Sequence, residues 1–313
     1  MRCIMPTTEN DYYRRIYLRL NTRIPLQMTL NMDVKGAGET VLKASLLDGP
    51  SSTGIVIIPG LTVPRESCFR LLHSFAPYKT LLYDIRGQSH SEGEVDFEKC
   101  VTDVNTIGRW FKNKYKLKRL IGIGHSFSGI CLLKASMDRQ HPYDLRIALA
   151  APFDMSRATS GVPKRFTKLF IYLYNTTRWL TYKPYRDEIF QRRHLYRPNE
   201  FAKNPYVGAL KLNRHSVMSR IITLTPKLED FISGIALPSC LVYGGNDKRI
   251  GNEEYFKKQY AIINDAALKR GFGVCIMPGL SHRFNLEPEK EFVLSCNNNE
   301  IIRKIEDIIK AQN

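Results

Sequence analysis

The chain has 313 residues, of which 43% are hydrophobic and 25% charged, and this composition excludes a disordered or membrane-spanning chain and favours a folded globular protein. The 47 Lys and Arg residues against 30 Asp and Glu give a formal net charge of +17. Such a charge favours an acidic partner, for example nucleic acid, an anionic membrane surface or an anionic substrate.

The N-terminal sequence MRCIMPTTEN lacks the continuous apolar segment of a signal peptide. No run reaches the roughly 18 consecutive apolar residues of a membrane-spanning helix. The seven cysteines form no CxxC pair, and several stand inside apolar runs where a free thiol behaves as a small hydrophobe. We therefore expect a cytoplasmic protein with reduced cysteines.

Strand and helix patterns alternate along most of the chain. Residues 25–36 and 40–50 read as two half-buried antiparallel strands joined by a turn. Short apolar runs closed by Gly, Pro, Asp or Ser follow at residues 54–60, 79–85, 119–126, 145–152, 239–247 and 272–279. Helical periodicity is found at residues 96–116, 128–139, 253–269 and 299–313. This alternation predicts an α/β fold with a doubly wound, mostly parallel sheet and an antiparallel edge.

The alternation stops between residues 153 and 230, where no convincing apolar strand is found. This stretch is interrupted by prolines and rich in aromatic residues, and it holds 15 Lys and Arg against 6 Asp and Glu. The pattern predicts several short helices inserted as a basic cap. The remaining residues, 1–152 and 231–313, would form the core that carries the sheet.

The stretch RLIGIGHSFSGI, residues 119–130, ends a predicted strand on a serine flanked by small residues. A sharp strand-to-helix turn needs small residues two positions before and after its tip, and it exposes a serine hydroxyl for attack on a carbonyl carbon. Gly124 and Ser128 occupy those two positions around Ser126. The sequence predicts a nucleophile elbow with Ser126 at its tip, although a helix N-cap serine would also fit this segment alone.

An acid and a base are expected at the ends of later strands, in the chain order Ser, Asp or Glu, His. Asp247 follows one apolar strand and His282 follows the next one. We expect His282 to act as the general base for Ser126, and Asp247 to orient its ring. We expect His125, beside the serine, to have a supporting role and not to be the general base.

Two backbone donors are expected to bind the oxyanion that forms during acyl transfer. One is the N–H of Phe127, the residue after the serine, and the other belongs to the loop after the first long core strand, at Leu61 or Thr62. Pro64 has no N–H to offer. The histidines and cysteines show no metal-ligand spacing, and no nucleotide-binding fingerprint is present. The predicted chemistry therefore uses neither a metal nor a cofactor.

At these residues the chain resembles the α/β-hydrolase superfamily, in particular its branch of monoacylglycerol lipase-like and serine aminopeptidase-like proteins. The resemblance covers residues 30–310 and includes YDIRGQSHSEG, residues 83–93, which is similar to the branch's Asp-x-Arg-Gly-x-Gly-x-Ser segment. It implies that Asp84, Arg86 and Gly87 hold this loop near the active site, and that the substrate enters between the sheet and the cap.

Two positions depart from the pattern of that branch. The chain has Pro59-Gly60 where His-Gly is usual in the oxyanion loop, and it has Ser128 where glycine is usual. Both changes keep the backbone donors, so an intact reaction centre is expected. We count Gly60, Thr62 and His125 as substrate-binding residues, together with Phe170 and Trp179 of the aromatic and basic cap segment.

The leading hypothesis is a serine hydrolase that cleaves an acyl ester through an acyl-enzyme on Ser126. A thioesterase or acyltransferase acting on an acyl-carrier or acyl-coenzyme A thioester is the first alternative, because a basic cap could bind the phosphates of such a substrate. A peptidase of the same fold is a further possibility. The second class of hypothesis is a non-catalytic protein whose basic cap docks on nucleic acid or an anionic membrane. The expected partners are a small ester or thioester and an anionic membrane surface, with no specific nucleic acid.

Overall fold

A single eight-stranded sheet forms the centre of the protein. The computed structural model describes residues 29–61, 63, 65–88, 91–152, 228–247, 265, 269–282, 284 and 298–312. Its strands are β1 (Thr29–Lys35), β2 (Val41–Asp48), β3 (Thr53–Ile58), β4 (Lys79–Tyr83), β5 (Arg119–His125), β6 (Leu145–Leu149), β7 (Ser239–Gly244) and β8 (Gly273–Met277). Each of the eight predicted strands is present at its predicted place in the sequence.

The sheet has the strand order β1-β2-β4-β3-β5-β6-β7-β8. β2 pairs antiparallel with both β1 and β4, and every later pair is parallel. The prediction of a mostly parallel sheet with an antiparallel edge is therefore confirmed. Because β3, β5, β6, β7 and β8 run the same way, the loops that follow them meet at one edge of the sheet, where ligands bind in open α/β sheets.

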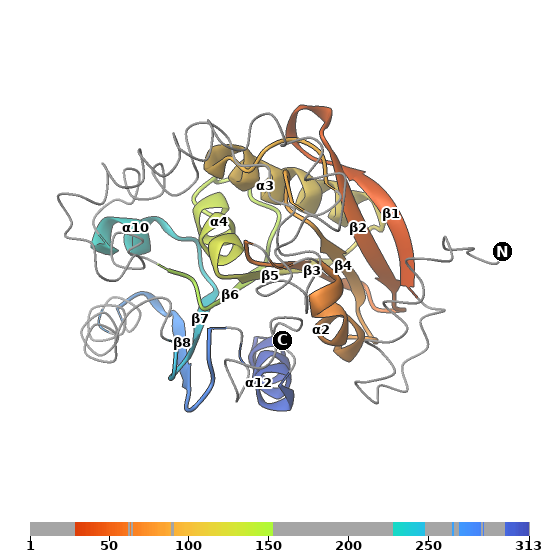
Figure 1. Ribbon diagram of the computed structural model, residues 1–313. Helices are drawn as coiled ribbons and strands as arrows, with labels where there is room; N and C mark the ends of the chain where they lie inside the picture. Colours follow the sequence, from red (N-terminus) through yellow and green to blue (C-terminus); the bar gives the residue numbers. More distant parts are fainter. Residues whose placement is uncertain are drawn as a thin grey trace, which may run out of the picture.

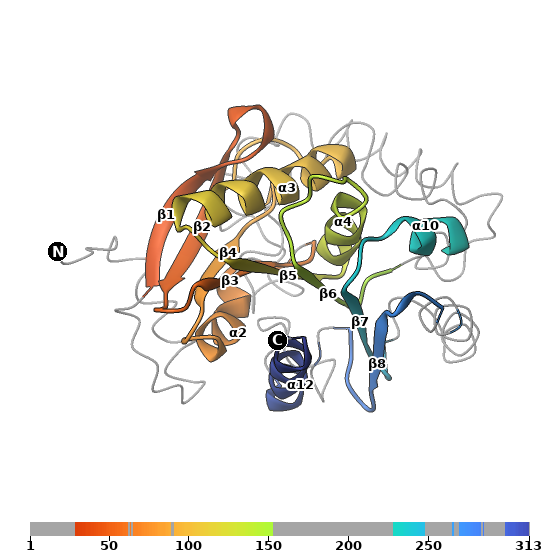
Figure 2. The ribbon, with the colours of Figure 1, turned by 180° about the vertical axis from the view of Figure 1, so that it is seen from behind.

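Helices cover both faces of the sheet. α3 (Phe97–Lys114) and α4 (Phe127–Ala135) lie on one face, and α2 (Phe69–Ser74) and α12 (Asn299–Ala311) lie on the other (Figures 1 and 2). This cover explains why the strands carry continuous apolar runs, since a sheet buried on both faces has no polar side. In β5 and β6 nearly every residue is buried.

Two long helices begin at residues whose side chains cap the first helical turn. Asp96 accepts a hydrogen bond from the Lys99 N–H at the start of α3, and Asn298 accepts one from the Glu300 N–H at the start of α12. The apolar residues at helical spacing face the sheet: in α12 these are Ile301, Ile302, Ile305 and Ile309, all buried. Each cap satisfies a donor that the first turn of a helix leaves open.

Some predicted elements lie outside the described residues, and some observed helical segments were not predicted. Residues 153–227 of the predicted cap and most of the predicted helix at 253–269 are not described. α10 (Leu228–Gly234) spans the predicted boundary at residue 230. α2 and the 3-10 turn before it, Arg65–Cys68, were missed because six residues of helix are too few to show a helical period.

The described cysteines Cys68, Cys100, Cys131, Cys240 and Cys275 are free thiols, and all but Cys275 are buried. Burial raises the pKa of the Cys100 thiol well above its usual range and that of Cys240 to about 11. These thiols therefore pack as small hydrophobic side chains. Among the described helices, none is both long enough and apolar enough to cross a membrane.

Candidate active site

Ser126 lies at the tip of a sharp turn between β5 and α4. Its backbone has φ 52° and ψ −121°, a left-handed conformation that non-glycine residues seldom adopt. The turn is fixed because the Ser126 N–H donates to the Leu149 carbonyl at 2.7 Å and the Ser126 carbonyl accepts from the Gly129 N–H at 2.9 Å. The surroundings thus enforce a strained backbone that leaves the Ser126 side chain only half-buried.

The small residues around the turn are required by close backbone approach. A Cβ atom at Gly124 would lie 2.6 Å from the Ser128 carbonyl oxygen, so no larger residue fits there. Ser128 is fully buried, and its hydroxyl donates to the Pro59 carbonyl. The serine that replaces the usual glycine therefore ties the elbow to the loop after β3.

Three side chains from separate strand ends form an unbroken row of hydrogen bonds. The His282 Nε2 atom lies 2.9 Å from Ser126 Oγ, and its Nδ1 atom lies 2.7 Å from Asp247 Oδ2. Asp247 follows β7 and is 2% exposed, whereas Ser126 and His282 are half-buried. This row reproduces the order predicted from the sequence and joins a buried carboxylate to a serine that solvent can reach.

The loops that carry Asp247 and His282 are bonded to each other. The Asn246 N–H donates to the Leu280 carbonyl at 2.9 Å, and the Gly245 N–H donates to the Met277 carbonyl at 2.8 Å. These backbone bonds continue the pairing of β7 with β8 beyond the ends of both strands. The separation of the carboxylate from the imidazole is thus set by main-chain geometry.

His125 is buried, with 3% of its surface exposed, and its ring lies 5.2 Å from that of His282 between centroids. Its Nε2 atom is 2.8 Å from the His282 carbonyl oxygen, so the ring donates to the backbone of the loop that carries His282. This contact fits the supporting role expected for His125. A direct contact between His125 and a substrate stays a prediction.

The predicted oxyanion donors Phe127 and Leu61 belong to two segments that adjoin Ser126. Phe127 is the first residue of α4, where backbone N–H groups have no acceptor within the helix. A Cβ atom on Gly60 would lie 3.1 Å from the Ser126 Cβ atom, so the loop after β3 runs directly against the serine. Leu61 follows in that loop and is half-buried. Thr62, Phe170 and Trp179 lie outside the described residues.

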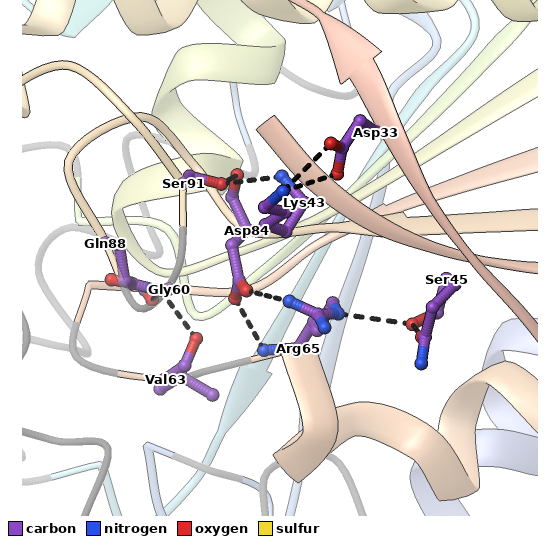
Figure 3. Close-up of polar contacts among 10 residues, drawn as sticks. Asp33, Lys43, Ser45, Gly60, Val63, Arg65, Asp84, Gln88 and Ser91 are labelled. Carbon is purple, nitrogen blue, oxygen red and sulfur yellow. Dashed lines mark hydrogen bonds and ion pairs between the residues drawn. The ribbon is translucent and has the colours of Figure 1, made fainter. Parts of the chain in front are cut away.

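We use the name oxyanion loop for residues 59–63. Just beyond it, Arg65 is held by Asp84, whose carboxylate accepts from the Arg65 N–H at 2.7 Å and from Arg65 Nη1 at 2.6 Å (Figure 3). Asp84 is fully buried and Arg65 is 8% exposed. Nothing in the sequence pattern pointed to Arg65, because the pair forms only when the fold brings the two loops together.

The segment from Asp84 to Ser91 is anchored to elements away from the serine as well. The Arg86 guanidinium forms two hydrogen bonds of 2.6 Å with the Asp103 carboxylate on α3, and a third of 3.0 Å with the Ala37 carbonyl. Ser91 donates to the Asp84 carbonyl and accepts from the Lys43 N–H (Figure 3). These contacts agree with the loop-holding role that the family resemblance implies.

Replacing Arg86 with methionine is expected to lower the free energy of unfolding by about 3–5 kcal/mol, because the buried Asp103 carboxylate would lose its charged partner. Both side chains are at most 4% exposed. Urea unfolding followed by circular dichroism measures the loss. The double variant Arg86→Met/Asp103→Leu should recover part of it, since no unpaired charge remains.

The Lys112→Met variant is the control for this prediction. Lys112 pairs with Asp144 at the surface, where both side chains are partly exposed, so its loss should cost no more than about 1 kcal/mol. Equal losses in the Lys112 and Arg86 variants would contradict the claim that the buried pair anchors the segment.

The fold and the hydrogen-bonded row together define the α/β-hydrolase class. Residues 55–289, most of the chain, match the family model described as serine aminopeptidase, S33, and the chain belongs to this family. A search of curated proteins found no match. Among the described residues, no group of three His, Cys, Asp or Glu could hold a metal ion.

Solved structures with the same fold include enzymes named as lipases. A putative lipase from Acinetobacter baumannii AYE is 14% identical, with a TM-score of 0.62, and the alignment covers 100% of this chain and 98% of that one. The monoacylglycerol lipase of Paleococcus ferrophilus is 13% identical, with a TM-score of 0.61 and coverage of 87% and 99%. At these identities the likeness shows the fold alone.

Proposed function

We propose that the protein is a serine carboxylester hydrolase that cleaves an acyl ester through an acyl-enzyme on Ser126. The observation that carries this proposal is the unbroken row from the buried Asp247 carboxylate through His282 to Ser126 Oγ, with bonds of 2.7 and 2.9 Å. A hydroxyl at this distance from an imidazole can give up its proton as it attacks.

In the acylation step, Ser126 Oγ bonds to the carbonyl carbon of the ester while its proton passes to His282 Nε2. The Asp247 carboxylate accepts a hydrogen bond from Nδ1 and stabilises the imidazolium that forms. The carbonyl oxygen becomes an oxyanion, which the Phe127 and Leu61 N–H groups bind. Collapse of this intermediate breaks the bond to the leaving alcohol, which takes the proton from His282.

In the deacylation step, water attacks the acyl-enzyme and gives its proton to His282, and the proton then returns to Ser126 as the carboxylic acid leaves. The start of α4 supports both steps, since the N-terminus of a helix favours negative charge. Apart from the ester and the water, every group that these steps require belongs to the chain itself.

We infer the substrate class from the similar structures and from the composition of the predicted cap. The names of the similar structures, lipase and monoacylglycerol lipase, suggest an ester with an apolar acyl chain. The predicted cap, with Phe170 and Trp179 among many basic residues, would bind such a chain or contact an anionic membrane surface. The same basic composition also favours a thioesterase acting on acyl-coenzyme A as the second candidate.

Treatment with a fluorophosphonate followed by intact-mass spectrometry tests the proposed nucleophile. Wild-type protein and the Ser136→Ala control, which alters a buried serine near the end of α4, should gain one adduct, whereas Ser126→Ala should gain none. Absence of an adduct on folded wild-type protein would contradict the proposal. Turnover of nitrophenyl butyrate against butyryl-coenzyme A and an amino-acid nitroanilide then separates esterase, thioesterase and peptidase.

A further inference from the structure

Gln88 is a buried side chain that contacts the oxyanion loop directly. It is 1% exposed, and its Nε2 atom donates to the Val63 carbonyl at 2.6 Å and to the Gly60 carbonyl at 3.3 Å (Figure 3). Gln88 stands at an unspecified position of the Asp-x-Arg-Gly-x-Gly-x-Ser segment, so the sequence pattern assigned it no role. One amide group thereby holds both ends of the turn that contains Leu61.

These hydrogen bonds determine the direction of the Leu61 N–H. The Gly60 carbonyl also accepts from the Val63 N–H at 3.1 Å, which closes the turn. In a planar trans peptide the N–H points opposite to the carbonyl of the preceding residue. Because the Gly60 carbonyl is held, the Leu61 N–H is held in the opposite direction. Within the described part of the chain, that N–H donates to no backbone carbonyl.

Three side chains hold the loop or the residue just beyond it. The Ser128 hydroxyl holds the Pro59 carbonyl, and the Asp84 carboxylate holds Arg65. Within the described part of the chain, Gln88 is the side chain that donates to both the Gly60 and the Val63 carbonyls. Removal of the other two contacts would loosen the ends of the loop, whereas removal of the Gln88 amide would leave the peptide plane that carries the donor held by the Val63 N–H alone among the described contacts.

The position of Gln88 is itself fixed by a tight double turn. Its N–H donates to the Ile85 carbonyl at 3.2 Å, and its carbonyl accepts from the Ser91 N–H at 2.9 Å. Gly87 before it has φ +69°, and a Cβ atom there would lie 2.5 Å from the Val95 nitrogen, so only glycine allows this path. Two backbone hydrogen bonds and the conformation of Gly87 therefore fix the backbone of Gln88.

We propose that Gln88 is a positioning residue that aims the Leu61 N–H at the oxyanion, an inference that rests on the proposed hydrolase function. Its carboxamide suits the role because a single NH₂ group supplies two donors, one for each carbonyl. Methionine has similar size but no donor, and glutamate would present acceptors to two carbonyl oxygens. Gln88 touches neither Ser126 nor His282 through any described contact, so it acts through the loop.

The Gln88→Met variant is expected to lower kcat for nitrophenyl butyrate about 10- to 100-fold, with KM changed little, because a misplaced oxyanion donor weakens transition-state binding more than substrate binding. The inhibition constant of a trifluoromethyl ketone, which forms an oxyanion on the nucleophile, should rise by a similar factor. Inhibition by the product butyrate should stay the same.

The matched control is Asn105→Leu. Asn105 is also a buried carboxamide that donates to a backbone carbonyl, that of Ala135 at 3.0 Å, but it joins α3 to α4 away from the oxyanion loop. A purely structural role for Gln88 would make the two variants alike, with equal losses of Tm and of kcat. The positioning role requires that Asn105→Leu keep wild-type kcat even where its Tm falls as much.

The Gln88→Glu variant gives a second measurement that does not depend on folding of the methionine variant. A buried carboxylate beside two carbonyls has a raised pKa, and its protonated form can donate one hydrogen bond. Its kcat relative to wild type should therefore rise several-fold as pH falls from about 8 to about 5.5. A ratio that is constant with pH would overturn the role of Gln88.

The outcomes separate the two proposals. Wild-type turnover together with normal kcat in Gln88→Met would overturn the positioning role alone. Absence of Ser126-dependent turnover in the wild-type protein would overturn the proposed function and, with it, the role of Gln88.

Discussion

Ser126→Ala is expected to lower kcat for nitrophenyl butyrate by about 10⁶-fold while the Tm stays close to that of the wild type. The loss is large because the hydroxyl supplies both the attacking atom and the proton that His282 receives, and His282 Nε2 lies 2.9 Å from it. Residual catalysis by the oxyanion donors would remain. Stopped-flow and long steady-state assays of purified variants together cover the required range.

The double variant Ser126→Ala/His282→Ala should be no slower than Ser126→Ala, because the two residues act as one unit and the loss of either removes the same step. Ser136→Ala, a buried serine near the far end of α4, is expected to keep wild-type kcat. Retention of more than about 1% of activity in Ser126→Ala would show that hydrolysis takes place elsewhere.

The sheet could be predicted from the sequence because its physical cause is local. A strand buried on both faces must be apolar throughout, and runs such as those of β5 and β7 end at glycine or polar residues where the chain leaves the sheet. α2 could not be predicted in this way. Its residues Phe69, Leu71 and Leu72 are buried by the surrounding tertiary structure, and six helical residues show no period of their own.

The residues of the candidate active site show the same difference between what the sequence predicts and what only the tertiary structure determines. Ser126, Asp247 and His282 could be predicted because topology alone brings the ends of β5, β7 and β8 to one edge. The contacts of Gln88 and Ser128 with the oxyanion loop could not, because they depend on the distance between segments more than 20 residues apart. The residue type at one position does not indicate which distant residue it will contact.

The two positions that depart from the usual family pattern contact each other in the structure. The chain has proline where the branch usually has the histidine of His-Gly, and Ser128 where it usually has glycine. In the structure the Ser128 hydroxyl donates to the carbonyl of that proline, Pro59. A buried hydroxyl needs a partner, and this carbonyl supplies one, so each change is compatible with the other.

Asp247→Asn is expected to lower kcat by about 10⁴-fold with little change in KM or in Tm. The Asp247 carboxylate accepts the Nδ1 proton at 2.7 Å, which leaves the Nε2 lone pair directed at Ser126 Oγ. An asparagine can present its NH₂ group to Nδ1 instead. The ring proton would then move to Nε2, and His282 could no longer accept the proton of Ser126.

The size of this effect distinguishes a tautomer-setting carboxylate from a simple tether, because an asparagine of equal shape can still hold the ring by a hydrogen bond. Asp307→Asn, an exposed carboxylate on α12, is the matched control and should keep wild-type kcat. A loss of less than about 10-fold in Asp247→Asn would mean that another group sets the tautomer of His282. A loss near that of Ser126→Ala would mean that the charge on Asp247, beyond its hydrogen bond, is required to stabilise the imidazolium.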